Sequence, residues 1–142
     1  MHTTWSDGTL GLREMAEAAE NLGYSYIAVT DHSVSSRIAN GLSEDRFRKQ
    51  WKEIEELNEQ LSSFRILRGV EVEVRGDERL DFDNKFLREF DLVGASIHRG
   101  FRQSPDKLTM RALGARAKPL SQRSLPRILL YPCSITQRVN SP

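Results

Sequence analysis

Residues 26–33 read YIAVTDHS, an apolar run that ends directly in an aspartate and a histidine. Its first five residues are rich in β-formers, which predicts a short buried strand. Upstream, apolar residues recur at spacings of three and four and Gly23 follows them, which predicts a helix that is capped near Thr9 and stops at the glycine. The helix therefore leads into a strand whose carboxyl end carries Asp31 and His32.

Alternation of helix and strand continues downstream. The expected elements are a helix after the cap Ser43, a strand at 65–74, a short helix capped by Asp83, a strand at 91–97 and a helix from Pro105 to about Leu113. Residues 1–9 are expected to form a strand stub and then a turn. This order predicts an α/β fold with parallel strands and helices outside, either open or curved into a barrel. Enzymes on such sheets place their chemistry at the carboxyl ends of the strands.

Metal-competent side chains fall at those strand ends. Because side chains alternate along a strand, Glu71 and Glu73 share one face of the strand at 65–74, opposite its valines. A buried parallel strand is more often apolar on both faces, so two carboxylates on one face need water or cations. His32, His98 and His2, the three histidines of the chain, all lie at or near the same expected edge.

This set of nitrogen and oxygen donors suits zinc, manganese or iron. Two or three such ions close together lower the pKa of a bridging water and clamp a phosphoryl group. Arg37, Arg99 and Arg102 are placed to bind phosphate charge, although each can equally be a surface residue.

Plain structural roles compete with these assignments. A lone histidine is more often a surface or core residue than a ligand. Asp7 and Asp31 can each be a turn or helix cap, and we expect Glu73 to be solvated at the sheet end. The metal hypothesis depends on the combination, since every histidine of the chain falls at a motif position.

Composition fits one ordinary domain of 142 residues with 29% charged side chains. No run of eighteen apolar residues and no signal-peptide pattern occurs, and Cys133 is the single cysteine, so we expect a cytoplasmic protein without a membrane span. No acid follows Asp106, whereas seven of the 21 basic residues do. That change predicts a boundary near residue 113 and a basic, aperiodic tail at 114–142 that is poorly ordered or binds nucleic acid.

Several motifs, taken together, resemble the PHP family, the polymerase and histidinol phosphatase domain. They are HTTWSDG, AVTDHS, ANGLS, GVEVEV, LDF and SIH, in the family's order, and the resemblance covers about residues 1–113. It is closest to the PHP domain of bacterial and archaeal family X DNA polymerases. The resemblance implies a distorted (β/α)7 barrel, of which about the first four βα units are present here.

The resemblance also implies a centre of up to three divalent metal ions and phosphoesterase activity, as a 3′-5′ exonuclease or in end processing. By position, it implies metal ligands at His2, Asp7, His32, Glu71 and His98. It gives Asp31 an orienting role in catalysis, and we assign Arg99 to the catalytic site as well. The expected partners are a phosphate ester or a nucleic-acid end as substrate, and a second copy of the chain along the open sheet edge.

The sequence departs from the family pattern at three motifs. The first histidine of His-x-His, the later His-Pro and the closing Asp-x-His are missing. We therefore expect a fragment with an internal start and an out-of-frame end, in which activity is impaired. Three functions remain open: a metal-dependent phosphoesterase, a non-catalytic PHP remnant and a basic-tailed nucleic-acid-binding module.

Overall fold

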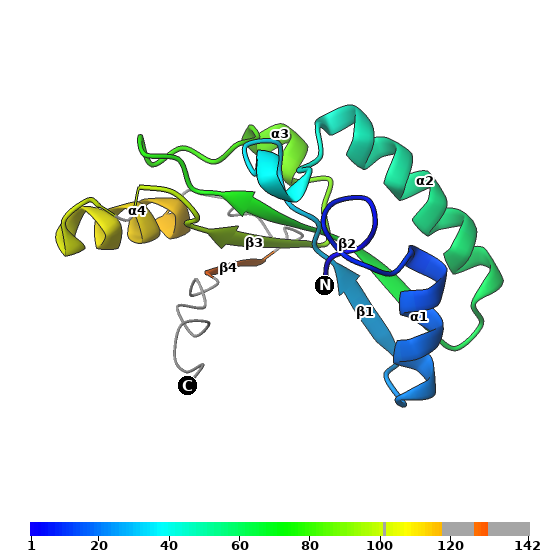
Figure 1. Ribbon diagram of the computed structural model, residues 1–142. Helices are drawn as coiled ribbons and strands as arrows, with labels where there is room; N and C mark the ends of the chain where they lie inside the picture. The colour runs from blue at the N-terminus through cyan, green and yellow to red at the C-terminus, as the bar shows by residue number, and fades with distance from the viewer. Residues whose placement is uncertain (101, 118–126, 131–142) are drawn as a thin grey trace, which may run out of the picture.

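The computed structural model describes residues 1–100, 102–117 and 127–130. Four parallel strands form one sheet in the order β1-β2-β3-β4, and helices lie in the connections between successive strands (Figure 1). The elements are α1 Leu12–Asn21, β1 Tyr26–Val29, the 3-10 helix η1 Arg37–Ala39, α2 Glu44–Gln60, β2 Arg65–Glu73, α3 Asn84–Leu87, β3 Leu92–Ser96, α4 Pro105–Ala117 and β4 Arg127–Leu130. The predicted α/β class with parallel strands is confirmed.

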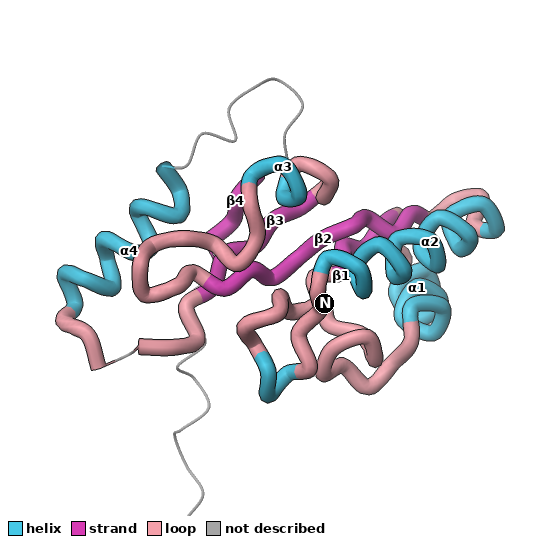
Figure 2. Tube along the Cα trace, turned by 90° about the horizontal axis from the view of Figure 1, so that it is seen from above, coloured by secondary structure: helices cyan, strands magenta, loops and turns pink. Residues whose placement is uncertain are grey.

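Helices α1 and α2 pack on β1 and β2 and touch each other, whereas α4 lies beyond the carboxyl ends of β2 and β3 (Figures 1 and 2). Because the strands are parallel, their carboxyl ends all point the same way, toward α4 (Figure 1). In the described part of the chain, none of the helices is long and apolar enough to span a membrane.

Two predicted caps and one predicted stop are confirmed. The Ser43 hydroxyl accepts a hydrogen bond from the backbone N–H of Arg46, and Asp83 accepts one from Phe86, which satisfies orphan donors at the starts of α2 and α3. Gly23 ends α1 with a φ of +82°, a conformation that glycine adopts without steric cost.

Other boundaries differ from the sequence prediction. Helix α1 is capped at Gly11 rather than Thr9, because the Glu14 carboxylate accepts the Gly11 N–H at 2.9 Å. Residues 1–9 form turns and no strand, because the backbone N–H groups of Ser6 and Gly8 both fold back onto the carbonyl oxygen of Thr3.

The predicted tail lies mostly outside the described residues. Of residues 114–142, the structure describes 114–117, which continue α4 beyond Leu113, and 127–130, which form β4 within the stretch expected to be aperiodic. The division of the chain at residue 113 stays a prediction.

An aromatic cluster forms the part of the core between α2 and α3. Phe47 is fully buried, and its ring meets those of Phe82 and Phe90 edge to face at centroid distances of 5.8 and 5.1 Å. Trp51 and Phe86 complete the cluster. Such contacts between aromatic rings add to the free energy of burial, so the cluster fixes α2 over the sheet.

We predict that Phe47→Ala lowers the free energy of unfolding by about 3–5 kcal/mol, because it removes a fully buried ring and leaves a cavity. Urea unfolding followed by circular dichroism measures the change. Lys49→Ala, an exposed position on the same helix, is the control and should change stability little. A Phe47→Ala midpoint equal to that of the control would contradict this account of the core.

Candidate metal centre

The backbone of β1 and β2 places His32 beside Glu71. His32 continues the line of β1 and forms an isolated parallel bridge with Glu71. The bridge is held by the Glu71 N–H, which donates to the Asp31 carbonyl at 3.1 Å, and by the Ser33 N–H, which donates to the Glu71 carbonyl at 3.0 Å. The alternation predicted for β2 thus directs Glu71 toward the end of the neighbouring strand.

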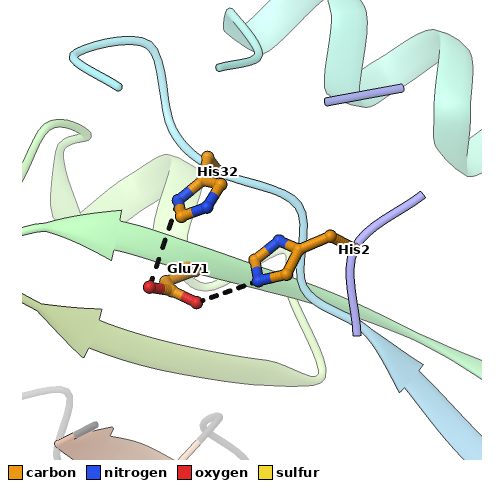
Figure 3. Close-up of side chains that lie close together, drawn as sticks. All are labelled: His2, His32 and Glu71. Atoms are coloured by element: carbon orange, nitrogen blue, oxygen red, sulfur yellow. Dashed lines mark ion pairs between the residues drawn. The ribbon is translucent and has the colours of Figure 1, made fainter. Parts of the chain in front are cut away.

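Glu71 is the centre of the cluster (Figure 3). Its carboxylate oxygens lie 3.3 Å from His2 Nε2 and 3.0 Å from His98 Nε2, and His32 Nδ1 is 4.0 Å away. The rings of His2 and His32 stack at a centroid distance of 4.4 Å, and the ring of His98 stands edge-on to His32 at 5.2 Å. Three imidazoles from three separate segments therefore surround one carboxylate.

Asp7 closes the cluster from the N-terminal loop. Its carboxylate oxygens lie 3.7 Å from His32 Nε2 and 3.9 Å from His2 Nδ1. The loop folds tightly because Gly8 lies against the backbone of His2, where an added Cβ would come within 2.3 Å of the carbonyl oxygen. The structure thus brings together all five residues that the sequence suggested as ligands; the ligand role itself stays a prediction.

Asp31 is fully buried. In the described part of the chain, none of its hydrogen bonds or ion pairs involves one of the three imidazoles. Its carboxylate accepts hydrogen bonds from the Thr3 N–H and hydroxyl at 2.7 Å each, from the Ser6 hydroxyl at 2.5 Å and from Gln50 Nε2 at 2.6 Å. Four donors compensate the cost of burying this carboxylate. Asp31 therefore ties the loop that carries His2 and Asp7 to the end of β1 and to α2.

The expectation that Glu73 is solvated at the sheet end is wrong. Glu73 is 3% exposed, because the loop after β3 and helix α4 cover it. Its carboxylate accepts the backbone N–H of His98 and lies 2.8 Å from His98 Nδ1, with Arg111 Nη2 at 3.9 Å on the other side. A carboxylate that accepts a hydrogen bond from one imidazole nitrogen fixes the tautomer of the ring, so that the other nitrogen can bind a metal ion.

The predicted phosphate-binding arginines separate into two groups. Arg99 donates a hydrogen bond to the carbonyl of Ser35 and lines a cavity together with Arg37. Arg102 is exposed and is not among the described residues that line this cavity. The catalytic role expected for Arg99 and Asp31 stays a prediction.

Hydrogen bonding sets the direction of the pKa shifts of Glu71 and His98, whereas burial sets that of His32. Burial alone would raise the pKa of Glu71, but hydrogen bonds from His2, His98 and Ser96 hold that pKa well below its usual range. Hydrogen bonds to Glu71 and Glu73 raise the pKa of His98 to about 10. Burial lowers the pKa of His32, which favours its neutral form. The cluster thus contains an ionised carboxylate beside a neutral imidazole, the protonation states in which both bind metals.

The donor set fits a divalent ion. Three possible ligand atoms lie within 4.8 Å of one another, one each from His2, His32 and Glu71. Buried Nδ1 atoms of His2 and His32 have no hydrogen-bond partner among the described residues, and each can offer a lone pair to a cation. Two imidazoles and a carboxylate are a common set for zinc, manganese or iron.

Sequence reasoning missed several supporting residues. Gln50, which is 1% exposed in a helix with a densely charged outer face, was not expected to reach Asp31. Asp81 accepts hydrogen bonds from Ser33 and Ser35 and so holds the loop after His32. Only helical spacing hinted that Gln50 faces the core, because it lies three residues after Phe47 and four before Ile54.

Comparison with known proteins identifies the family of this chain. The model of the PHP domain family matches residues 1–125. The chain belongs to the PHP domain family. Proteins of this family generally bind divalent metals.

A curated relative is "DNA polymerase/3'-5' exonuclease PolX" of Bacillus subtilis, which is 50% identical over 113 residues. The match covers 80% of this chain and 20% of the relative, so the chain spans about a fifth of that protein.

We predict that Glu73→Gln lowers zinc affinity about 10- to 100-fold, because a neutral amide oxygen accepts a weaker hydrogen bond from the Nδ1–H of His98 than a carboxylate does. Competition with a chromophoric chelator measures the affinity. Glu55→Gln, an exposed change on α2, is the matched control. Equal zinc affinity in both variants would show that Glu73 does not position His98.

We further predict a pH-dependent contribution of His98 to stability in the metal-free protein. Its pKa is raised in the folded state, so its ion pairs stabilise fully below the unfolded value of about 6.5 and lose this effect as pH rises through about 10. The difference in free energy of unfolding between the wild-type chain and His98→Gln, measured in EDTA, should therefore be largest near pH 6 and shrink toward pH 10. A difference that is constant across this range would rule out a protonated His98.

Proposed function

We propose that this chain is a metal-dependent phosphoesterase that acts on nucleic-acid ends or small phosphate esters. The observation that carries the proposal is the convergence of three histidines with Glu71 and Asp7 at the carboxyl ends of β1, β2 and β3. Membership of the PHP family supports the same chemistry, as does the Bacillus subtilis relative, which is named a 3'-5' exonuclease.

Bound divalent ions would supply an activated water and neutralise phosphoryl oxygens. His2, His32, His98, Glu71 and Asp7 would hold them. Glu73 contacts Nδ1 of His98 and so keeps Nε2 directed at Glu71.

The remaining residues position the loop and the substrate. Asp31 fixes the loop of His2 and Asp7, and Arg99, beside the cluster, would bind phosphate oxygens.

Activity is proposed to be weak. Five ligand-type side chains in the described part of the chain would be shared among up to three ions, and an ion with two protein ligands is held less well than one with three or four. A non-catalytic PHP domain is the alternative. A cytoplasmic location and self-association along the open edge of the sheet stay predictions.

We predict that the purified chain retains at least about one equivalent of zinc, manganese or iron and hydrolyses a phosphodiester or the 3′ end of an oligonucleotide slowly. His32→Ala and Glu71→Ala should lose both metal and hydrolysis, because each removes a donor from the cluster. Elemental analysis and end-labelled oligonucleotide assays measure the two properties, with Arg88→Ala as an exposed control.

Dialysis against EDTA should abolish hydrolysis, and added manganese should restore it. A folded wild-type chain that takes up no metal would instead identify the non-catalytic alternative.

A further inference from the structure

His98 lies beyond the point where the sheet ends. At the ends of β2 and β3, the N–H of Val74 donates a hydrogen bond to the carbonyl oxygen of Ser96 at 2.8 Å. In the described part of the chain, no backbone hydrogen bond joins residues 97–99 to residues 74–76. The sheet therefore does not fix the direction of the His98 side chain, and other contacts have to do so.

Arg111 of α4 supplies the next link between the two strand ends. Its side chain is 3% exposed. Its Nη2 donates to the carbonyl oxygen of Val74 at 2.5 Å, and its Nη1 donates to that of Arg99 at 2.9 Å. Val74 directly follows Glu73 in the sequence, and Arg99 directly follows His98. The guanidinium thus ties together the two segments that carry this carboxylate and this imidazole.

The same guanidinium faces the carboxylate that contacts His98. Arg111 Nη2 lies 3.9 Å from Oε1 of Glu73, whereas Oε2 of Glu73 lies 2.8 Å from His98 Nδ1. Because Glu73 is 3% exposed, water does little to support its charge, and the loss of either partner would change how the carboxylate is held. Two routes therefore connect Arg111 to His98, one through the backbone and one through Glu73.

The remaining contacts of Arg111 also lie within the protein. Its Nε donates to the carbonyl oxygen of Arg75 at 3.2 Å, and its Nη1 donates to Gln103 Oε1 at 3.1 Å. Every nitrogen of the guanidinium is thus engaged by the segments around His98. Arginine suits this position because its donors form a rigid planar fork, whereas a lysine offers three donors from a single nitrogen.

We propose that Arg111 is a positioning residue of the candidate metal centre, which keeps Nε2 of His98 directed toward Glu71. These two groups lie 3.0 Å apart. The inference rests on the proposed function, because it requires a metal ion at this centre. Helix α4, which carries none of the candidate ligands, is then needed for the affinity of the centre.

The test measures the zinc affinity of the full chain by competition with a chromophoric chelator. Arg111→Met should lower the affinity about 10- to 100-fold, the usual effect of removing a residue that orients a metal ligand. Arg111→Lys should lower it less, because it retains a charge beside Glu73 but not the fork. Lys107→Met removes an exposed charge from the same helix and should bind zinc as the wild type does.

A second background separates positioning from general destabilisation. His98→Gln should bind zinc more weakly but measurably, because His2, His32 and Glu71 still offer three ligand atoms. In that chain, Arg111→Met should change the zinc affinity by no more than about twofold, since the imidazole that Arg111 directs is absent. Circular dichroism verifies that each variant is folded.

Three results would overturn the proposal: equal zinc affinity of Arg111→Met and Lys107→Met, the same loss of affinity with and without His98, or failure of both Arg111 variants to fold, which would make this arginine a purely structural residue. Zinc affinities as expected, without hydrolysis by the metal-loaded chain, would refute the proposed function alone. Metal-dependent hydrolysis together with wild-type zinc affinity in Arg111→Met would refute the positioning role alone.

Discussion

The buried carboxylate of Asp31 is the constraint on which the site depends. A buried carboxylate without partners would be protonated or would destabilise the fold, so each of its hydrogen-bond donors is held in place. Thr3 and Ser6 supply three of these bonds, and Gln50 of α2 supplies the fourth. The N-terminal loop has no regular secondary structure to hold it, and these bonds fix His2 and Asp7 opposite His32. The arrangement of the candidate ligands therefore depends on Asp31, which is not itself one of them.

Parallel strand geometry supplies the other half of the site. Register between β1 and β2 sets His32 beside Glu71, and register between β2 and β3 sets Glu73 beside Ser96, two residues before His98. These local rules are readable in the sequence, because apolar runs mark the strands and alternation assigns the faces of Glu71 and Glu73. The helices around the strands follow from apolar spacing and capping residues in the same way. The fold class and the grouping of the candidate ligands were therefore predictable.

Features set by contacts between distant segments were not predictable. Alternation placed Glu73 on the face of Glu71, but its burial depends on Arg111, which comes 38 positions later in the sequence. The Asp31–Gln50 bond likewise joins the end of a strand to the middle of a helix. Residues 1–9 form turns rather than a strand because hydrogen bonds to one carbonyl, that of Thr3, override the β propensity of the stretch. In each case the partner is chosen by packing, which single-sequence patterns do not encode.

The distribution of charge explains how one small region can serve both a cation and an anion. Glu71 and Asp7 face the imidazoles and leave a negative recess, in which a divalent ion can replace the proton that His98 carries. On the other side of Glu73 the accessible groups are arginines. The negative charge of Glu73 is balanced by His98 and Arg111, so it does not cancel the charge of the other arginines. Glu73 lies between the two groups of charges, because it lines the arginine side and also contacts His98.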